Sequence, residues 1–448
     1  MTSVLLIYPY FKPRRDRSVF RFPPLGISYV AARLQQAGHS VRLIDCTFLD
    51  RERAISMARS AKADVVGIYC MATLLKDCLW FASEMRSHCS LLVAGGPLPT
   101  CDPPAFLGHF DVVVRGEGEE TMVELLQAHE AGRELRQVRG ITFREKEVIS
   151  TAERPMARDL DAIPFPARGL LPNESYIRFG KEKQGYSTTT ILSTRGCPFV
   201  CDFCSNVVFG GSYRARSPEK VVDEIEEVLS LGYDRVSFSD DVFTFKRARL
   251  IRICEEIRRR SLHFKWDCLA RVDAMDFEMA GEMRDAGCTK IYFGIESGNE
   301  DMLKLMKKEI TLDQARNAVE SAHRAGLEVG AFFILGYPGD TDDTVLETLR
   351  FATSLPIDYL GLTMPYPLPG TGLYERVRHR ISRDWRPGSG FFGSQSLVFN
   401  SDFSRAKMWF GILKGHVQFK IRKKTGRLAP LLMKIFEKPT DALFRLLK

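Results

Sequence analysis

The stretch STRGCPFVCDFCSN, residues 193–206, contains three cysteines at the spacing C-x3-C-x2-C and follows an apolar run, 188–192, that predicts a short buried strand. The cysteines are Cys197, Cys201 and Cys204, and no other follows until Cys254. Structural zinc sites and ordinary ferredoxin clusters each use four protein ligands. Three thiolates on one loop therefore indicate a 4Fe-4S cluster with one iron left open. The alternatives are a zinc knuckle or three incidental buried thiols.

The composition is that of an ordinary globular protein, with 448 residues of which 45% are hydrophobic and 27% charged. Eleven cysteines without a secretion signal indicate a reducing, cytoplasmic location. No apolar run approaches the roughly 20 residues that span a bilayer, so an integral membrane protein is not expected. The net charge of +8 is concentrated in residues 401–448, which hold 12 Lys and Arg against 3 Asp and Glu. A general nucleic-acid-binding surface is therefore not indicated.

Residues 1–150 alternate short apolar runs with stretches of helical apolar spacing. This alternation is typical of a Rossmann-like, doubly wound parallel sheet with helices on both faces. The expected strands are 4–8, 41–45, 65–69, 91–94 and 111–114, and the expected helices are 25–37, 51–61 and 74–88.

Doubly wound sheets bind ligands in the loops at the carboxyl ends of their strands. Those loops are expected at 9–24, 70–73, 95–97 and 115–119. Gly95 and Gly96 lack a β-carbon, so the backbone there can approach a large flat ligand. No G-x-G-x-x-G dinucleotide fingerprint follows the first strand.

Residues 151–185 carry four prolines and few periodic apolar residues, which is typical of a linker. From 186 to 370, six strand and helix units predict a partial (β/α)6 barrel with its chemistry at the carboxyl ends of the strands. Gly232, Gly287 and Gly326 are expected to cap helices. The expected strands are 188–192, 235–239, 264–269, 290–293, 329–335 and 359–363.

The cysteine motif, with Gly196, Pro198 and Phe203 around it, resembles that of the radical S-adenosylmethionine (SAM) superfamily. The resemblance implies that the three cysteines hold a 4Fe-4S cluster. It also implies that the amino and carboxylate groups of SAM chelate the open iron, with Phe203 in the cofactor site.

Residues after the predicted barrel strands resemble the SAM-binding segments of this family. The family's G-G-E motif is replaced here by two adjacent acids, Asp240 and Asp241. Asp240 is nearer to the end of the predicted strand 235–239, so it is the expected partner of the SAM amino group. Arg271 is expected either to pair with the SAM carboxylate or to form a core ion pair with a neighbouring Asp. Glu296 and Ser297, in the segment G-I-E-S-G, are candidates for the ribose hydroxyls, and Gly336 lies in the adenine-side segment.

Segments of the first domain resemble the cobalamin-binding domain of cobalamin-dependent radical SAM enzymes, among them PPLGI at 23–27, AGGP at 94–97 and VRGEGE at 114–119. The motif D-x-H-x-x-G, which supplies a histidine to cobalt in many cobalamin enzymes, is absent. The first histidine, His39, precedes a strand and is expected at the surface, so no protein histidine is expected beneath cobalt. The alternative is a Rossmann-like fold that has lost its ligand. The resemblance makes the following residues cobalamin-binding candidates: Tyr8, Thr73, Gly95, Gly96, Gly116 and Glu117.

The C-terminal extension, residues 371–448, mixes Lys and Arg with large apolar residues such as Trp409, which predicts basic amphipathic helices. Such helices most commonly cap the barrel and leave a solvated basic face. The alternative is peripheral docking on an acidic partner or an anionic membrane surface.

The resemblance implies a C-methyltransferase that needs an external electron donor. A 5'-deoxyadenosyl radical formed from SAM would abstract hydrogen from an unactivated carbon of a small molecule, lipid or protein side chain, and methylcobalamin would supply the methyl group. Rival interpretations are a cyclase resembling the anaerobic porphyrin ester cyclase, a tRNA methylthiotransferase, and a non-catalytic cobalamin or cluster sensor. The loop after the first strand contains no cysteine for a second cluster, so a methylthiotransferase with a nucleic-acid partner is not favoured. The sequence leaves the catalytic residues unknown.

Overall fold

The computed structural model describes residues 2–11, 21–381, 398–425 and 429–447, which divide into two compact units. Within the described residues, the first unit contains 2–11, 21–197 and 206–236. The second contains 198–205, 237–381, 398–425 and 429–447. The predicted first barrel strand therefore belongs to the same compact unit as the N-terminal sheet.

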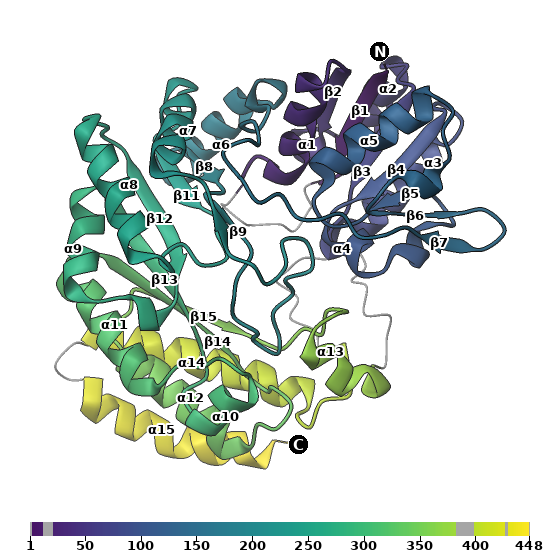
Figure 1. The fold of residues 1–448 in the computed structure, drawn as a ribbon. Helices are drawn as coiled ribbons and strands as arrows, with labels where there is room; N and C mark the ends of the chain where they lie inside the picture. The colour runs from purple at the N-terminus through teal and green to yellow at the C-terminus, as the bar shows by residue number, and fades with distance from the viewer. Residues whose placement is uncertain (1, 12–20, 382–397, 426–428, 448) are drawn as a thin grey trace. The chain divides into compact units, whose positions relative to one another are not determined.

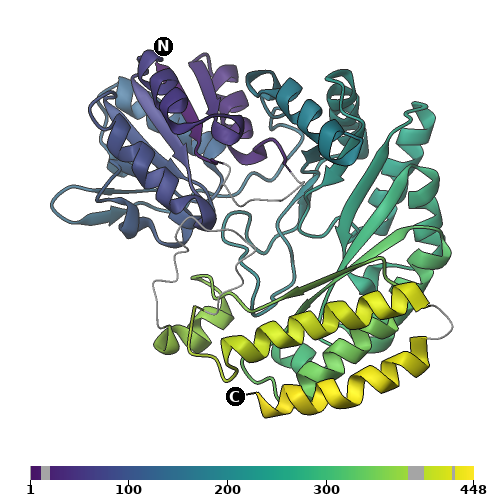
Figure 2. The ribbon, with the colours of Figure 1, turned by 180° about the vertical axis from the view of Figure 1, so that it is seen from behind.

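The N-terminal sheet has seven strands in the order β2-β1-β3-β4-β5-β6-β7. The five predicted strands are present and pair in parallel, which confirms a doubly wound sheet. Helices α1 and α5 pack together on one face, and α2 and α3 lie on the other (Figures 1 and 2). The antiparallel hairpin of β6 and β7 was not predicted. The elements are β1 Ser3–Tyr8, α1 Leu25–Gln36, β2 Ser40–Asp45, α2 Arg51–Ser60, β3 Val65–Tyr69, α3 Leu75–Met85, β4 Leu91–Gly95, α4 Pro97–Cys101, β5 Val112–Val114, α5 Gly118–Glu130, β6 Ile141–Arg144 and β7 Val148–Ser150.

The segment predicted as a linker contains helix α6, Asn173–Gln184, and several buried side chains. The hydroxyl of Tyr176 donates a hydrogen bond to Asp45 Oδ2 (2.6 Å) at the end of β2, and its ring packs edge-on against Phe48. Arg168, also buried, pairs with Glu224 of α7 (2.7 Å) and donates to Thr189 of β8 (3.0 Å). The segment is therefore tied to both sheets by polar side chains that helical or strand periodicity does not reveal.

The second sheet has six strands in the order β15-β14-β13-β12-β11-β8, all at the positions predicted for a partial barrel. The pairs β12–β13, β13–β14 and β14–β15 are parallel. Gly232, Gly287 and Gly326 have φ angles of +93°, +96° and +88°, which confirms their predicted place at helix ends. The elements are β8 Thr188–Ile191, β9 Thr194–Arg195, β10 Arg214–Ala215, α7 Pro218–Ser230, β11 Arg235–Phe238, α8 Arg247–Arg259, β12 Lys265–Ala270, α9 Phe277–Asp285, β13 Cys288–Glu296, α10 Glu300–Leu305, α11 Leu312–Arg324, β14 Glu328–Ile334, α12 Asp342–Ser354, β15 Tyr359–Thr363 and α13 Gly372–Val377.

Seven short 3-10 helices lie between these elements in the described residues. They are η1 Cys46–Phe48, η2 Ala72–Leu74, η3 Pro103–Phe106, η4 Leu135–Gln137, η5 Arg168–Leu170, η6 Val272–Ala274 and η7 Arg378–Arg380.

The C-terminal extension forms two helices, α14 Arg405–Thr425 and α15 Ala429–Leu446, that lie side by side (Figures 1 and 2). Helix α14 packs on α12 and β15, and its Met408 side chain contacts the backbone at Gly336. Lys414 is 2% exposed and lies 2.9 Å from Asp441 of α15. The two helices therefore cap the barrel, as their apolar content predicted.

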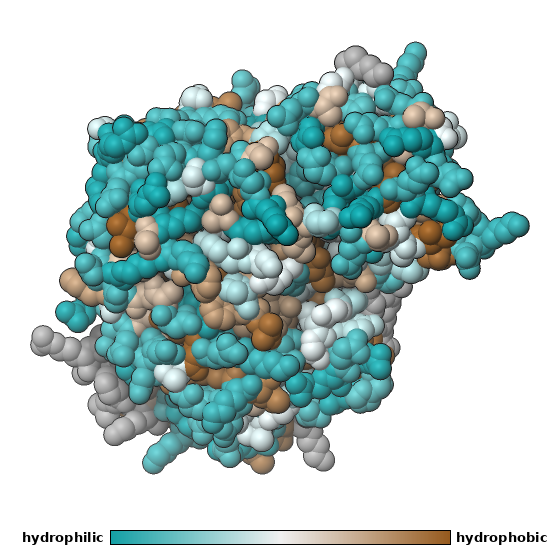
Figure 3. Space-filling view, in the orientation of Figure 1, coloured by the Kyte–Doolittle hydropathy of each residue, from teal (hydrophilic) through white to brown (hydrophobic). Residues whose placement is uncertain are grey.

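No helix in the described ranges is long and apolar enough to cross a membrane. The face shown in Figure 3 is mostly hydrophilic, and its apolar side chains form small, scattered patches.

Candidate functional site

The three motif cysteines lie outside regular secondary structure and remain accessible. Cys197 and Cys201 are half-buried and Cys204 is exposed, whereas six of the other eight cysteines are buried. Burial raises the pKa of the Cys201 thiol, and the positive charges of Lys308 and Arg271 act in the opposite direction. Accessible thiols near cations fit the thiolate ligands that an iron–sulfur cluster requires. Across the described residues, no three His, Cys, Asp or Glu side chains are already gathered around a metal position, so the cluster assignment rests on this donor chemistry.

The cysteine loop is anchored through Asp202, the residue after the second cysteine. Its carboxylate accepts hydrogen bonds from Tyr337 (2.6 Å) and Arg376 (3.1 Å), and its backbone carbonyl accepts from Leu373 N–H (2.8 Å). A side chain at Gly372 would collide with this carboxylate. Tyr337 is 1% exposed. Its burial raises the pKa of its phenol, and its hydrogen bond to Asp202 raises this pKa further. The segments after β14 and β15 therefore position the loop that carries Cys201 and Cys204.

Arg271 forms an ion pair with a neighbouring Asp, which is the second of its two predicted roles. Its Nε and Nη2 atoms each lie 3.0 Å from a carboxylate oxygen of Asp273, and Nη2 also donates to the Lys308 carbonyl (3.1 Å). Its guanidinium stacks 3.5 Å from the centre of the Phe199 ring, inside the cysteine loop. The observed role of Arg271 is thus to support that loop, and a bond to the SAM carboxylate remains a prediction.

Glu296 ends strand β13 in a conformation that non-glycine residues seldom adopt, with φ of +77°. Its carboxylate is buried and pairs with the buried Lys308 ammonium (3.1 Å). A β-carbon at Gly294 would lie 2.5 Å from the Glu296 carboxylate, which explains the glycine of this motif. Backbone strain of this kind concentrates at ligand sites, so Glu296 remains a ribose candidate.

The other predicted SAM residues differ in their surroundings. Ser297 is 1% exposed, and its hydroxyl lies 3.2 Å from Thr348 Oγ1 and accepts from Asn299 N–H (3.2 Å). This side chain therefore supports the start of α10, and its contact with ribose remains a prediction. Asp240 is completely buried after β11. Phe203 packs edge-on against Tyr337 and lies under Lys308 Nζ (5.9 Å).

Tyrosines occupy the carboxyl ends of the central strands in the N-terminal sheet. The Tyr8 ring lies 5.6 Å from Tyr69 and 6.3 Å from Tyr10, centre to centre, and burial raises the pKa of Tyr8. Thr73, in the 3-10 helix η2 after β3, is half-buried. The three tyrosines come together at the strand ends, where the sequence places cobalamin.

The two predicted glycines after β4 have different surroundings. Gly96 has φ of +111°, and a β-carbon there would lie 2.6 Å from the Cys70 carbonyl and 3.1 Å from the Tyr69 ring. The fold itself therefore requires Gly96 to be glycine. At Gly95 the nearest atom to a β-carbon, in Val114, is 4.0 Å away, so this backbone leaves more room.

The loop after β5 contains Gly116, with φ of +68° and little around it, followed by Glu117. The carboxylate of Glu117 is buried and bonded to Arg195 (3.1 Å), Arg214 (2.8 Å) and Ala157 N–H (2.9 Å). Its side chain thus has protein partners, and a contact of Glu117 with cobalamin remains a prediction. His39 was expected at the surface, and this is wrong: it is 8% exposed and precedes β2, at the end of the strand opposite the ligand loops.

Sequence reasoning did not assign roles to Asp202, Lys308 or Glu119, although each contacts a predicted site segment. The one local signal was Asp202, an acid enclosed by the apolar residues of the cysteine motif. Lys308 pairs with Glu296, 12 residues earlier, and Glu119 pairs with Arg195, 76 residues later. Neither pair lies within one helix or strand, so the sequence pattern does not reveal these pairs.

Comparison with known proteins relates both parts of the chain to families. A model of the radical SAM superfamily matches residues 191–352, and a model of the B12-binding domain matches residues 12–126. An uncharacterized methyltransferase of Pyrococcus horikoshii is 32% identical over 97% of this chain and 95% of its own length. An anaerobic magnesium-protoporphyrin IX monomethyl ester cyclase of Cereibacter sphaeroides is 31% identical over 84% of this chain and 64% of its own.

A solved structure shows the same fold. It is TsrM, a radical SAM methyltransferase from Kitasatospora setae with cobalamin and a 4Fe-4S cluster bound. The TM-score is 0.72 at 20% sequence identity, over 85% of this chain and 75% of that one.

Proposed function

Because this chain belongs to the radical SAM superfamily and carries a B12-binding domain, we propose that it is a cobalamin-dependent methyltransferase acting on an unactivated carbon. The observation that supports methylation most is the similarity to a Pyrococcus methyltransferase over nearly the whole of both chains. The substrate is a small molecule, a lipid or a protein side chain. The reducing cytoplasm and an external electron donor suit a cluster with an accessible cysteine ligand.

The residues present fit the cofactors that this function needs. Cys197, Cys201 and Cys204 would hold the cluster, while Asp240 and Glu296 would bind the amino and ribose groups of SAM. When bound, the cluster and SAM supply a hydrogen-abstracting radical and cobalamin supplies a methyl group. The remaining task of the chain is positioning. Asp202, held by Tyr337, fixes the cysteine loop, because a buried carboxylate without partners would be costly.

Methyl transfer is tested with SAM labelled on its methyl group, hydroxocobalamin and the reduced protein, under anaerobic conditions. We expect release of 5'-deoxyadenosine and appearance of the label on cobalamin recovered from the protein, because both chemistries are assigned to one chain. The measurement is mass spectrometry of the two products. Release of 5'-deoxyadenosine with unlabelled cobalamin contradicts methylation and favours a cyclase, the second candidate, to which the 31% identity with the Cereibacter enzyme points.

The lower face of cobalt is expected to carry no protein histidine. His39 is buried at the opposite ends of the strands, whereas Tyr8, Tyr10 and Tyr69 lie at the ends where cobalamin is expected. Electron paramagnetic resonance of the cob(II)alamin-loaded protein should show no nitrogen splitting from an axial base, and H39A should give the same spectrum. Nitrogen splitting in the wild type that is lost in H39A would sink this assignment.

A further inference from the structure

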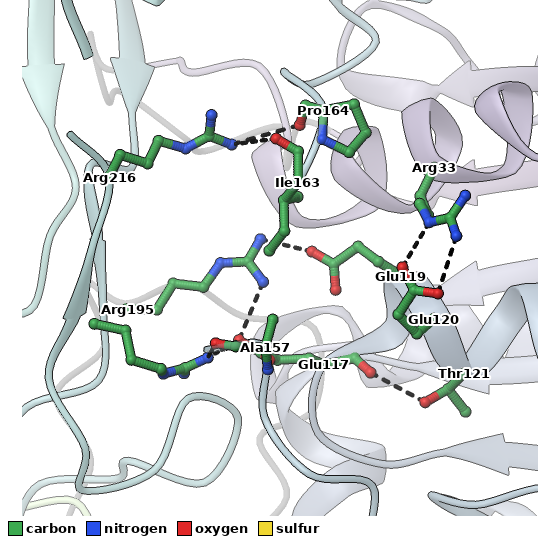
Figure 4. Close-up of polar contacts among 11 residues, drawn as sticks. Arg33, Glu117, Glu119, Glu120, Thr121, Ala157, Ile163, Pro164, Arg195 and Arg216 are labelled. Atoms are coloured by element: carbon green, nitrogen blue, oxygen red, sulfur yellow. Dashed lines mark hydrogen bonds and ion pairs between the residues drawn. The ribbon is translucent and has the colours of Figure 1, made fainter. Parts of the chain in front are cut away.

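Two glutamates that follow β5, Glu117 and Glu119, pair with arginines close to the cysteine motif (Figure 4). In the sequence, Arg195 precedes Cys197 and Arg214 follows it. Glu119 Oε1 accepts from Arg195 Nη2 (2.6 Å). Glu117 Oε1 accepts from Arg195 Nη1 (3.1 Å) and from Arg214 Nη1 (2.8 Å). We call these four side chains the clasp. All four belong to the first compact unit, so the contacts lie inside one body.

The four side chains of the clasp are buried, so each charge is stabilised by the opposite charges beside it and not by water. Its side chains are between 4% and 9% exposed. Arg195 is also enclosed by aromatic rings, at 5.0 Å from the centre of Tyr29 and 5.1 Å from that of Phe209. Burial by itself acts to lower the pKa of Arg195, but the charge and hydrogen bond of Glu119, with Glu117, outweigh it and raise the pKa. Removing one partner leaves a buried charge uncompensated, so separating these side chains costs free energy.

One side of the clasp lies on the backbone that leads into Cys197. Arg195 is two residues before Cys197 and lies in strand β9, which pairs with β10 through Arg214. Arg214 Nη2 also donates to the Phe209 carbonyl (2.9 Å). Between the arginine and the cysteine, Gly196 has φ of +82°, and a side chain there would collide with the carbonyls of residues 209, 210 and 212. A shift of Arg195 would therefore move the first cluster ligand.

The other side of the clasp lies in the loop where cobalamin is expected. Gly116 N–H donates to Thr100 Oγ1 (3.1 Å), and Glu117 stands at the start of helix α5. Glu117 Oε2 also accepts from Ala157 N–H (2.9 Å). Loops at the carboxyl ends of parallel strands are the ligand-binding edge of such sheets. The side chain of Glu117 is thus turned to the arginines while its backbone borders that edge.

We infer that the clasp couples the two cofactor sites, so that assembly of the cluster on Cys197 strengthens cobalamin binding at the loop after β5. Glu117, Glu119, Arg195 and Arg214 are positioning residues that act through the backbones they hold. The inference rests on the proposed function, since it requires both cofactors in one chain. By linkage, cobalamin must in turn stabilise the cluster by the same factor.

The test compares hydroxocobalamin affinity, by absorbance titration, in the cluster-loaded full-length protein and in the same protein before cluster reconstitution. For the wild type we expect affinity to rise on cluster loading by about fivefold or more, the usual lower range of coupling between sites. In E119Q this ratio should fall to about 1, because a neutral amide lacks the charge that makes the hydrogen bond from the Arg195 guanidinium strong. A role in stability alone would weaken both affinities and leave their ratio unchanged.

The neighbouring acid provides a matched control. Glu120 pairs with Arg33 between α5 and α1, but the two side chains are 52% and 25% exposed (Figure 4). E120Q should keep the wild-type ratio, since exposed pairs contribute little. R195K, which keeps the charge but loses the two-pronged geometry, should lower the ratio and serves where E119Q does not fold.

The outcomes separate the two claims. A wild-type ratio of 1, or an unchanged ratio in both E119Q and R195K, overturns the coupling while cobalamin binding itself still stands. Absence of cobalamin binding by the wild type in either form overturns the proposed function, and the coupling with it.

Discussion

Replacing Cys197, Cys201 and Cys204 together with Ala should remove the iron–sulfur cluster and all SAM cleavage. The wild-type protein, reconstituted anaerobically, should hold about four irons and four sulfides per chain, the content of one 4Fe-4S cluster. The triple variant should hold none, because no other cysteine spacing in the chain offers three thiolates from one loop. Iron and sulfide analysis, with 5'-deoxyadenosine release after reduction, measures both effects.

The control for the cysteine replacements is C89A. Cys89 is half-buried like Cys197 and Cys201 but lies outside the motif, after α3. Its replacement should leave iron content and SAM cleavage at the wild-type level. Stoichiometric iron and sulfide in the triple variant would rule out the cluster assignment.

Deleting residues 405–448 should make the protein insoluble, because the deletion removes α14 and α15, which cover the barrel. Met408 packs on the backbone at Gly336, and a β-carbon at Gly415 would contact the side chains of Leu349 and Leu362, which shows how closely α14 approaches. Arg422 donates to the carbonyls of Thr353 and Leu355, and Lys407 pairs with Asp342 (2.7 Å). These two positive charges of the tail therefore serve its attachment. The measurement is the soluble fraction after expression.

A single substitution, D441N, tests the contact between α14 and α15 without removing either helix. D441N leaves the buried Lys414 ammonium without its counter-charge 2.9 Å away, and burial already lowers the pKa of Lys414. Losing one partner of a buried ion pair costs about 3–5 kcal/mol, and the partial exposure of Asp441 places the expected loss at the lower end of that range. K420Q, at an exposed position of the same helix, should change stability by less than about 0.5 kcal/mol. Thermal unfolding measures both.

A soluble truncated protein whose barrel unfolds at the wild-type temperature would contradict the cap. If that protein also kept cluster assembly but lost turnover of a membrane-borne substrate, the tail would be a docking element instead. The exposed Trp409 and Leu413 on α14 would then be its apolar contact residues.

Several features of this protein are determined by the sequence alone, because they depend on residues close together in the chain. The cysteine spacing places three thiols on one loop, and the alternation of apolar runs with helical patterns locates the five parallel strands of the first sheet and the six strands of the second along the chain. Glycines such as Gly232 and Gly287 mark helix ends, because their left-handed backbone conformation excludes most other residues. These are local constraints, so they can be predicted without knowing how the elements pack.

The partners of the charged residues were decided only by the tertiary structure. Arg271 pairs with Asp273 and stacks on Phe199, and Glu117 pairs with Arg195 and Arg214. Glu119 and Arg195 are 76 residues apart, and no periodicity relates them. A buried charge takes whichever opposite charge packing brings within reach, because leaving it unpaired costs far more than any local preference contributes. The sequence therefore specifies which elements form and which cofactors they suit, while packing between distant segments decides which charged side chains are left for those cofactors.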